Sequence, residues 1–275
     1  MQEFDAIRPY SDEETAPAIK RLVNDREFLD MVGRFKSPLA AKWAPAVLRM
    51  FVRRWLVGNF GHYHRVDDLQ AELSKYVGEL VESTTSRVTH SGLENLSKTN
   101  AHLFISNHRD IVFDPMVVNY LLFQNGFLTT RIAIGDNLLQ NRVFAEMMRL
   151  NKSFVVRRNM TSPREMRDAY LTLSGFINHS IDTNHSIWIA QREGRAKDGI
   201  DATDPAIIKM FYMSRKKSGL DFGEAMNRLH IVPVSIAYEY DPCDADKARE
   251  LEVKARTGSY QKTEGEDSEQ IVKGL

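Results

Sequence analysis

The sequence predicts an α/β protein, in which a mixed sheet is covered by helices and a helical region precedes the sheet. Two observations lead to this fold class. From residue 86 onward, short apolar runs alternate with stretches of helical periodicity, the order typical of a sheet covered by helices. Before residue 86, only helical periodicity is present. We therefore expect a helical region over 1–85, an α/β domain over 86–242 and a polar C-terminal segment over 243–275.

The composition is that of a globular protein and excludes several classes of function. Of the 275 residues, 43% are apolar and 27% are charged. Lys+Arg and Asp+Glu both number 37, and a net charge of zero argues against a nucleic-acid partner. The single cysteine, Cys243, cannot form an internal disulfide and favours a cytoplasmic location. No apolar run is long enough to span a bilayer, so we expect any work on lipid to proceed from the membrane surface.

The N-terminal region contains two segments that predict ordinary amphipathic helices. Ser11 with Glu14 resembles a capping box and begins the first helical pattern, which extends to about residue 36. Residues 66–82 form the second pattern, with apolar residues three and four apart.

Between them lies a stretch of different character, 43–56, for which two interpretations remain open. Four large apolar residues fall four apart and arginines flank them: Trp43, Val47, Phe51 and Trp55, with Arg49, Arg53 and Arg54. An apolar stripe with a basic flank is typical of a helix that lies in a membrane interface. The same pattern suits a core helix with a solvated arginine edge. Pro45 is expected in the first turn of this helix.

The α/β domain is expected to contain five buried strands and an edge strand. Apolar runs predict the buried strands at 103–106, 132–135, 154–156, 186–190 and 231–238, and the edge strand at 87–90. Helical patterns follow at 115–124, 138–149, 162–179 and from Pro205 to about 217. The polar end from 244 onward shows no closing element, which leaves open that the sequence is a C-terminally incomplete version of a longer protein.

The loop after the first predicted strand carries candidate catalytic residues, namely His108, Asp110 and Asp114. A neutral imidazole can take a proton from a hydroxyl near pH 7, and a nearby carboxylate can fix its tautomer and stabilise the imidazolium. A structural role for the second aspartate competes with this interpretation. Asp114 followed by Pro115 is also a good helix cap, with proline at the first helical position.

Later strand ends carry positive charge: first Arg157 and Arg158, then Arg195 and Lys197 beside Glu193 and Gly194. Loops that leave the carboxyl ends of strands in an α/β sheet share one edge, so these side chains could converge on His108. A base beside guanidinium groups favours a hydroxyl-bearing anionic substrate, most simply a phosphate. Glycine at position 194 would let the backbone approach such an anion closely.

These blocks resemble the phospholipid/glycerol acyltransferase family, in the family's order. Residues 106–115 resemble its first block, asparagine-histidine followed by an aspartate, and 153–158 its second, an apolar strand ending in arginine. Residues 192–199 are similar to its glutamate-glycine-arginine block, and 231–234 to its proline-containing fourth block. The resemblance covers about residues 86–242.

The resemblance implies transfer of a fatty acyl group from acyl-CoA or acyl carrier protein to glycerol 3-phosphate or 1-acylglycerol 3-phosphate, in phospholipid synthesis. His108 would deprotonate the acceptor hydroxyl and Asp114 would orient His108. Arg157, Arg158 and Arg195 would hold the phosphate, and Glu193 would support an arginine. We expect no metal and no cofactor beyond the acyl donor. We also expect a peripheral location on the inner face of a membrane.

Two departures from the family pattern leave alternatives open. Five residues separate His108 from Asp114 where the family usually has four, so Asp110 stays a second candidate partner. The third block is one residue short, which leaves either Arg195 or Lys197 as the main phosphate ligand. The altered spacing also motivates an alternative function, a non-catalytic membrane-associated protein on a degenerate acyltransferase fold.

Overall fold

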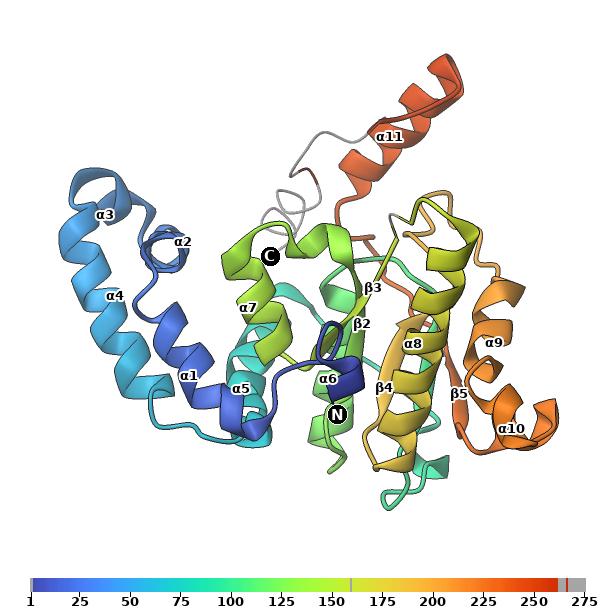
Figure 1. The fold of residues 1–275 in the computed structure, drawn as a ribbon. Helices are drawn as coiled ribbons and strands as arrows, with labels where there is room; N and C mark the ends of the chain where they lie inside the picture. The colour runs from blue at the N-terminus through green and yellow to red at the C-terminus, as the bar shows by residue number, and fades with distance from the viewer. Residues whose placement is uncertain (1, 159, 262–265, 267–275) are drawn as a thin grey trace. The chain divides into compact units, whose positions relative to one another are not determined.

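The structure is a computed structural model that describes residues 2–158, 160–261 and 266 (Figure 1). The chain divides into two compact units. Unit 1 consists of Met1–Ala6, Arg87–Ala133 and Val156–Leu275, and unit 2 consists of Ile7–Ser86 and Ile134–Val155.

Unit 2 is built mainly from helices, which confirms the predicted helical N-terminal region. They are α1 (Asp12–Leu22), α2 (Arg26–Lys36), α3 (Pro38–Trp43), α4 (Pro45–Phe60), α5 (Val66–Thr84) and α7 (Arg142–Leu150), with the 3₁₀ helix η3 (Asp136–Leu139). The carboxylate of Glu14 accepts the N–H of Ser11 at 2.8 Å, closing the predicted capping box of α1. Pro45 is the first residue of α4, as predicted. The capping box of α1 pairs N–H groups at the helix start that have no partner within the helix. Pro45 has no N–H group that would need a partner at the start of α4.

One apolar cluster holds unit 2 together. Its buried members are Ala18, Ile19, Leu22, Val23, Leu29, Val52, Leu56, Leu69, Val143 and Leu150. Gly33 of α2 lets α4 approach closely, because a Cβ there would lie 3.0 Å from the Leu48 side chain. Since Val143 and Leu150 belong to α7, the stretch 134–155 packs with the N-terminal helices. The sequence analysis placed that stretch in the α/β domain, so the compact units and the predicted domains divide the chain differently.

Within the described residues, the sheet has five strands in the order β3-β2-β4-β1-β5. The strands are β1 (Leu103–Ser106), β2 (Arg131–Gly135), β3 (Ser153–Val156), β4 (Ile187–Ala190) and β5 (Ile231–Val234). β1 pairs in parallel with β4 on one side and β5 on the other, and β2 pairs in parallel with β4. The α/β fold is therefore confirmed, with parallel pairing in all three of these pairs where we expected a mixed sheet.

The register of the central strands decides where the loops emerge. Ser106, the last residue of β1, lies opposite Ala190 of β4 and Val234 of β5, which are also the last residues of their strands. The central strands are buried on both faces, as parallel strands usually are: Leu103, Phe104, Ile187 and Trp188 are at most 2% exposed. The segments after β1, β4 and β5 consequently leave the sheet side by side at the same edge.

The helices of unit 1 are α6 (Phe113–Gln124), α8 (Pro163–Asp182), α9 (Pro205–Tyr212), α10 (Phe222–Asn227) and α11 (Asp244–Thr257), with the 3₁₀ helices η1 (Gln2–Phe4), η2 (Leu93–Asn95) and η4 (Arg215–Ser218). α8 packs on β4 and α9, and buries Phe176 and Ile177. Buried Asn178 of α8 donates to the carbonyl of Phe211 in α9 at 2.9 Å. Among the described residues, no helix is both long and apolar enough to cross a membrane.

Several predicted elements differ from the structure. Residues 87–90 form no strand, and β5 ends at Val234 rather than at 238. The helix that begins at Pro205 ends at Tyr212 and is followed by η4. The predicted polar C-terminal segment, 243–275, contains α11, which is tied down by ion pairs rather than by an apolar face. Residues 262–265 and 267–275 of that segment lie outside the described residues.

Candidate active site

The candidate site forms where three loops meet at the edge made by β4, β1 and β5. His108 follows β1 by two residues, and its carbonyl accepts the N–H of Ala196, from the loop after β4, at 2.8 Å. Gln191 begins that loop and donates its N–H to the carbonyl of Ser106 at 2.7 Å. The first and third blocks of the sequence are thus joined through their backbones. Every residue discussed for this site belongs to unit 1.

The imidazole of His108 is held by Asp114. Its Nδ1–H donates to Oδ2 of Asp114 at 2.8 Å, with the histidine side chain 13% exposed and the aspartate 0% exposed. The ring of Trp188 from β4 meets the imidazole edge-on, with ring centroids 5.9 Å apart. Because Nδ1 is committed to the carboxylate, Nε2 is the nitrogen that can accept a proton from a hydroxyl.

Asp114 accepts three further hydrogen bonds. The backbone N–H groups of Arg109 and Asp110 donate to Oδ2 at 2.7 and 3.0 Å, and the hydroxyl of Tyr238 donates to Oδ1 at 2.9 Å. A fully buried carboxylate requires such partners, because an unpaired buried charge is strongly unfavourable. The four donors fix both oxygens, so one of them faces His108 in a single orientation.

Asp110 has a different position, at the start of α6. Its Oδ1 accepts the N–H groups of Val112 and Phe113, both at 2.9 Å, and so caps the start of α6. This cap closes a turn between His108 and Asp114. Asp114 then lies in the first turn of α6, where its carboxylate reaches His108. Of the two candidate aspartates, Asp114 contacts His108, whereas Asp110 caps the start of α6.

Sequence reasoning missed Tyr238, which lies four residues beyond the end of β5. Burial first, and then the charge of Asp114, raise the pKa of Tyr238 above its ordinary value, so its hydroxyl stays protonated and donates. The only signal in the sequence was an aromatic residue at the end of the predicted strand. The bond joins positions 124 residues apart, which no local pattern reveals.

Asn107 also has a structural role that was not predicted, because it clamps the segment leading to Tyr238. Its Oδ1 accepts the N–H of Ile236 at 2.7 Å, and its Nδ2 donates to the carbonyl of Ile236 at 2.8 Å. Nδ2 also lies 3.2 Å from Asp201, which forms a 2.7 Å ion pair with Arg109. The first block is thus bound to both neighbouring loops.

Three of the predicted phosphate ligands, Arg157, Arg158 and Lys197, are partnered with carboxylates. Arg158 pairs with Glu193 at 3.4 Å, and Lys197 pairs with Glu250 of α11. Arg157 points to Glu165 of α8 at 2.9 Å instead of joining the loop after β4. Arg195 is 8% exposed and directly precedes Ala196, whose N–H bonds to the carbonyl of His108.

Gly194 adopts a left-handed conformation, with φ +77°, and a Cβ built there would meet nothing within 4 Å. Glycine is therefore favoured by the backbone conformation of this turn. The structure gives no sign that it is required by a close approach to another part of the protein.

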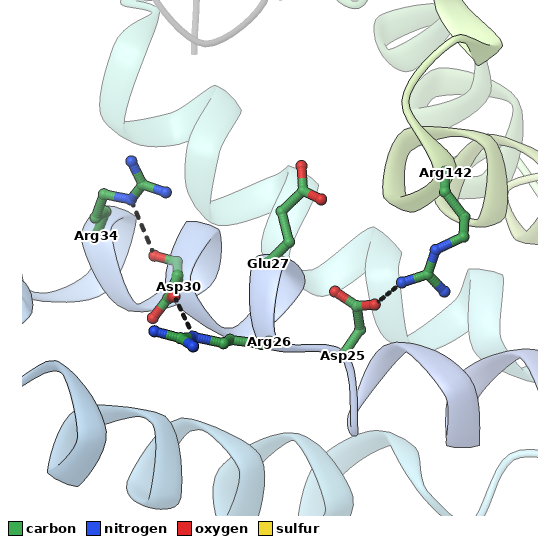
Figure 2. A pocket seen from close by; sticks show the side chains of 6 residues that line it. All are labelled: Asp25, Arg26, Glu27, Asp30, Arg34 and Arg142. Carbon is green, nitrogen blue, oxygen red and sulfur yellow. Dashed lines mark hydrogen bonds and ion pairs between the residues drawn. The ribbon is translucent and has the colours of Figure 1, made fainter.

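A separate charged pocket lies in unit 2 (Figure 2). Its lining residues are Asp25, Arg26, Glu27, Asp30, Arg34 and Arg142. Arg142 forms an ion pair with Asp25, and Arg26 lies 3.9 Å from Asp30. Three acids and three bases balance each other, so the pocket has no net charge to select an ion. Across the described parts of both units, no group of three or more His, Cys, Asp and Glu side chains is arranged to hold a metal ion.

Comparisons with known proteins give one informative result. A family model described as Acyltransferase matches residues 87–237, more than half of the chain. No curated protein matches. Among solved structures, chloroplast FtsY from Physcomitrella patens is similar at 13% identity over 95% of this chain and 84% of that chain, with a TM-score of 0.29, too low to support any argument. The matched range contains His108, Asp114 and the glutamate-glycine-arginine loop. The chain therefore belongs to the Acyltransferase family, and acyl transfer is its chemistry.

Proposed function

We propose that the protein transfers a fatty acyl group from acyl-CoA or acyl carrier protein to the hydroxyl of glycerol 3-phosphate or 1-acylglycerol 3-phosphate, a step of phospholipid synthesis. The observation that carries the proposal is the 2.8 Å hydrogen bond from His108 to the fully buried Asp114. It supplies an oriented base at the carboxyl edge of the sheet, beside a loop that carries Arg195 and Lys197. No metal or cofactor is part of the proposal.

The proposed reaction proceeds through general-base catalysis. Nε2 of His108 removes the proton from the acceptor hydroxyl as its oxygen attacks the carbonyl carbon of the thioester. The imidazolium that forms is stabilised by Asp114. The tetrahedral intermediate collapses, the C–S bond breaks, and the thiolate takes the proton back from His108. The product ester and the free thiol leave, and the base returns to its neutral form.

The cationic side chains are proposed to bind the phosphate of the acceptor. Arg195 is the main candidate, because it lies in the segment bonded to the carbonyl of His108 and is largely buried. Lys197 and Arg158 are secondary candidates, since each has a carboxylate partner that a phosphate would have to replace. Arg157 is the weakest candidate, because its guanidinium pairs with Glu165 on α8. Holding the phosphate would orient the hydroxyl toward His108.

A transfer assay with two donors and two acceptors tests the proposal. Radiolabelled acyl-CoA and acyl carrier protein are each combined with glycerol 3-phosphate and 1-acylglycerol 3-phosphate, with wild-type protein and His108→Ala. We expect one combination to dominate, and the variant to be inactive in it. If the folded wild-type protein produces no labelled lipid in any combination, the proposed acceptors are wrong.

The non-catalytic alternative was based on the altered spacing between His108 and Asp114, and the contact between the two residues argues against it. It would be favoured by a His108 too far from any carboxylate, and the contact is a normal hydrogen bond of 2.8 Å. We also propose that the enzyme works peripherally, on the inner face of a membrane.

A further inference from the structure

The helices α2, α3 and α4 of unit 2 carry a group of exposed apolar side chains, which we call the α3–α4 surface. α2 packs on both α3 and α4, so the three helices are neighbours (Figure 1). The side chains and their exposed fractions are Phe35 73%, Leu39 76%, Trp43 80%, Val47 52%, Met50 62% and Phe51 60%. So many large exposed apolar side chains on three neighbouring helices are uncommon on a soluble protein and indicate a binding surface.

Helix α4 is apolar on two faces. Val52 and Leu56 face the core of unit 2 and are 4% and 5% exposed, whereas Val47 and Phe51, also four apart, are on the exposed face. An ordinary amphipathic helix would carry polar residues at the exposed positions. The apolar residues of the exposed face are therefore not explained by the packing of unit 2.

The structure corrects the residues that the sequence assigned to a membrane interface. Trp55 packs against the core cluster, with Lys36 Nζ 3.9 Å from its ring centroid, and Leu56 is buried. Arg49 forms a 2.8 Å ion pair with Asp30. Trp43, Val47 and Phe51 remain exposed. The two interpretations of 43–56, core helix and interfacial helix, thus correspond to two faces of the same segment.

The charge of this region is strongly one-sided. From residue 31 to residue 66 the sequence contains no Asp or Glu, although the whole chain has no net charge. The same stretch contains seven basic residues: Arg34, Lys36, Lys42, Arg49, Arg53, Arg54 and Arg65. Lys36, Lys42, Arg53 and Arg54 are exposed and belong to the helices that form the surface or directly adjoin it. Aromatic and aliphatic groups among bases without acids match an anionic bilayer.

We infer that the α3–α4 surface binds an anionic phospholipid bilayer, with Leu39, Trp43 and Phe51 in the interface and the lysines and arginines at the head groups. A protein partner that buried this surface would need acidic groups opposite each exposed base. An anionic leaflet supplies negative charge at every position. The inference does not depend on which substrates the active site uses.

Vesicle co-sedimentation of the full chain tests this inference, with vesicles of phosphatidylcholine alone or mixed with phosphatidylglycerol. Wild-type protein should bind the mixed vesicles, and high salt should release only part of it. The double variant Trp43→Ser/Phe51→Ser should lose at least about tenfold in partitioning to mixed vesicles. Lys42→Glu/Arg54→Glu should lose about tenfold on mixed vesicles, with little change on phosphatidylcholine.

Matched controls come from unit 1. Leu128→Ser removes an apolar side chain that is 64% exposed, and Lys216→Glu/Lys217→Glu reverses two exposed bases; both should bind as wild type. Equal binding by the α3–α4 variants and these controls would refute the inference. It is also refuted if wild-type protein ignores mixed vesicles, or if light scattering reveals a dimer that Trp43→Ser/Phe51→Ser dissociates while vesicles stay unbound.

A second inference comes from a different observation, the hydrogen bond of Tyr238. The geometry points to Tyr238 as a positioning residue for the acyl transfer, acting through Asp114 on His108. Its hydroxyl is 2.9 Å from Oδ1, while Oδ2 serves His108. Asn107 fixes the segment that carries Tyr238 by bonding both backbone groups of Ile236. This inference rests on the proposed function, in which His108 is the base.

The hydroxyl has two effects on the dyad. It holds the carboxylate in one rotation, and it disperses the negative charge of Asp114 by a charge-assisted hydrogen bond. Without it, the charge would concentrate on the oxygens near His108, and the dyad would hold a proton more tightly. The base would then become available only at higher pH.

Tyr238→Phe tests this role, with Tyr212→Phe as its control. Tyr212 also donates a partly buried hydrogen bond, to the carbonyl of Leu220 at 2.9 Å, but not to the dyad. We expect Tyr238→Phe to lower kcat about tenfold with KM nearly unchanged, and to move the acid limb of the rate profile to higher pH. Tyr212→Phe should change neither.

A second readout needs no substrate. In protein labelled with ¹⁵N-histidine, the Nδ1–H proton of His108 should resonate far downfield, disappear in Asp114→Asn and shift in Tyr238→Phe. An unshifted resonance together with a wild-type pH profile would overturn the positioning role. A shifted resonance in a protein that transfers no acyl group to any tested acceptor would support the positioning role and refute the proposed acceptors.

Discussion

The two halves of the candidate site are built in different ways. The basic half, His108 with Asp114, is buried, and every oxygen of the carboxylate is bonded to a donor of the protein. The cationic half includes side chains that are paired with carboxylates: Arg158 with the exposed Glu193, and Lys197 with the less exposed Glu250. The first half is fixed before any ligand arrives. The second half must exchange partners when an anion binds.

The difference suggests separate roles for the two halves: the basic half orients the general base, and the cationic half recognises the acceptor. A general base is effective only when its geometry is held tightly, and a network with many donors achieves that. The Arg158–Glu193 pair is exposed and should open at little cost if a phosphate replaces the carboxylate. The Lys197–Glu250 pair is more buried, and its Coulombic gain is offset by the desolvation of both charges. Substitutions in the basic half should therefore reduce turnover, and substitutions in the cationic half should change the affinity for the acceptor.

The largest effect is expected for His108→Ala. Removal of the general base should lower kcat by about 10²–10⁴-fold. Thermal unfolding should stay close to wild type, because Asp114 keeps its three other hydrogen-bond donors when the imidazole is removed. The measurement is steady-state transfer alongside circular dichroism. Full activity in a folded variant would remove His108 from the mechanism.

The next effect separates the two aspartates. Asp114→Asn places an N–H₂ group among donors, so at least one of the four hydrogen bonds must break, and kcat should drop by about 10- to 100-fold. Asp110→Asn keeps an oxygen that can accept the two N–H groups at the start of α6, so activity should change by less than about threefold. The reverse ranking would show that the basic half is centred on Asp110.

Arg195→Ala should weaken binding of the phosphorylated acceptor. Loss of one charge-assisted contact, about 1.5–3 kcal/mol, should raise the KM for the phosphorylated acceptor by about 10- to 100-fold and leave the KM for the acyl donor nearly unchanged. Initial rates with each substrate varied in turn provide the measurement. Equal changes for both substrates would indicate a structural role for Arg195. They would contradict the assignment of acceptor recognition to the cationic half.

The smallest effect is expected for Glu250→Gln. It frees Lys197 from its carboxylate partner, so the KM for the acceptor should fall by about two- to fivefold, because desolvation of both charges offsets most of the attraction in this largely buried pair. Glu72→Gln, which breaks the Glu72–Lys75 ion pair in unit 2, is the control and should leave the KM unchanged. If Glu250→Gln raises the acceptor KM, the pair holds Lys197 in place for the substrate instead of competing with it.

The sequence was informative where the physical signal is local. Apolar runs located the five strands to within a few residues, apart from the overlong prediction for β5. The pattern after β1 also singled out His108. It could not decide between Asp110 and Asp114, because the decision depends on how a turn closes. Tyr238 and Glu250 were missed because their partners are 124 and 53 residues away.

Helix α4 illustrates another limit. Its apolar periodicity was visible, but Trp55 and Phe51 are alike in sequence and differ only in which side of the helix meets the core. Helical periodicity identifies faces and not their neighbours. The order in which helices pack has to come from the structure.

The Asn107 clamp and the Tyr238 bond also bear on when the site forms. His108 and Asp114 are six residues apart, whereas Asn107 meets Ile236 across 129 residues. Synthesis from the N-terminus therefore delivers the base early, while the strand that completes its surroundings emerges much later. Contacts between such distant residues form slowly, because a long loop must close first. A nascent chain that lacks β5 would contain the histidine and its aspartate but not the network that orients them, so catalytic competence would coincide with the docking of β5 beside β1.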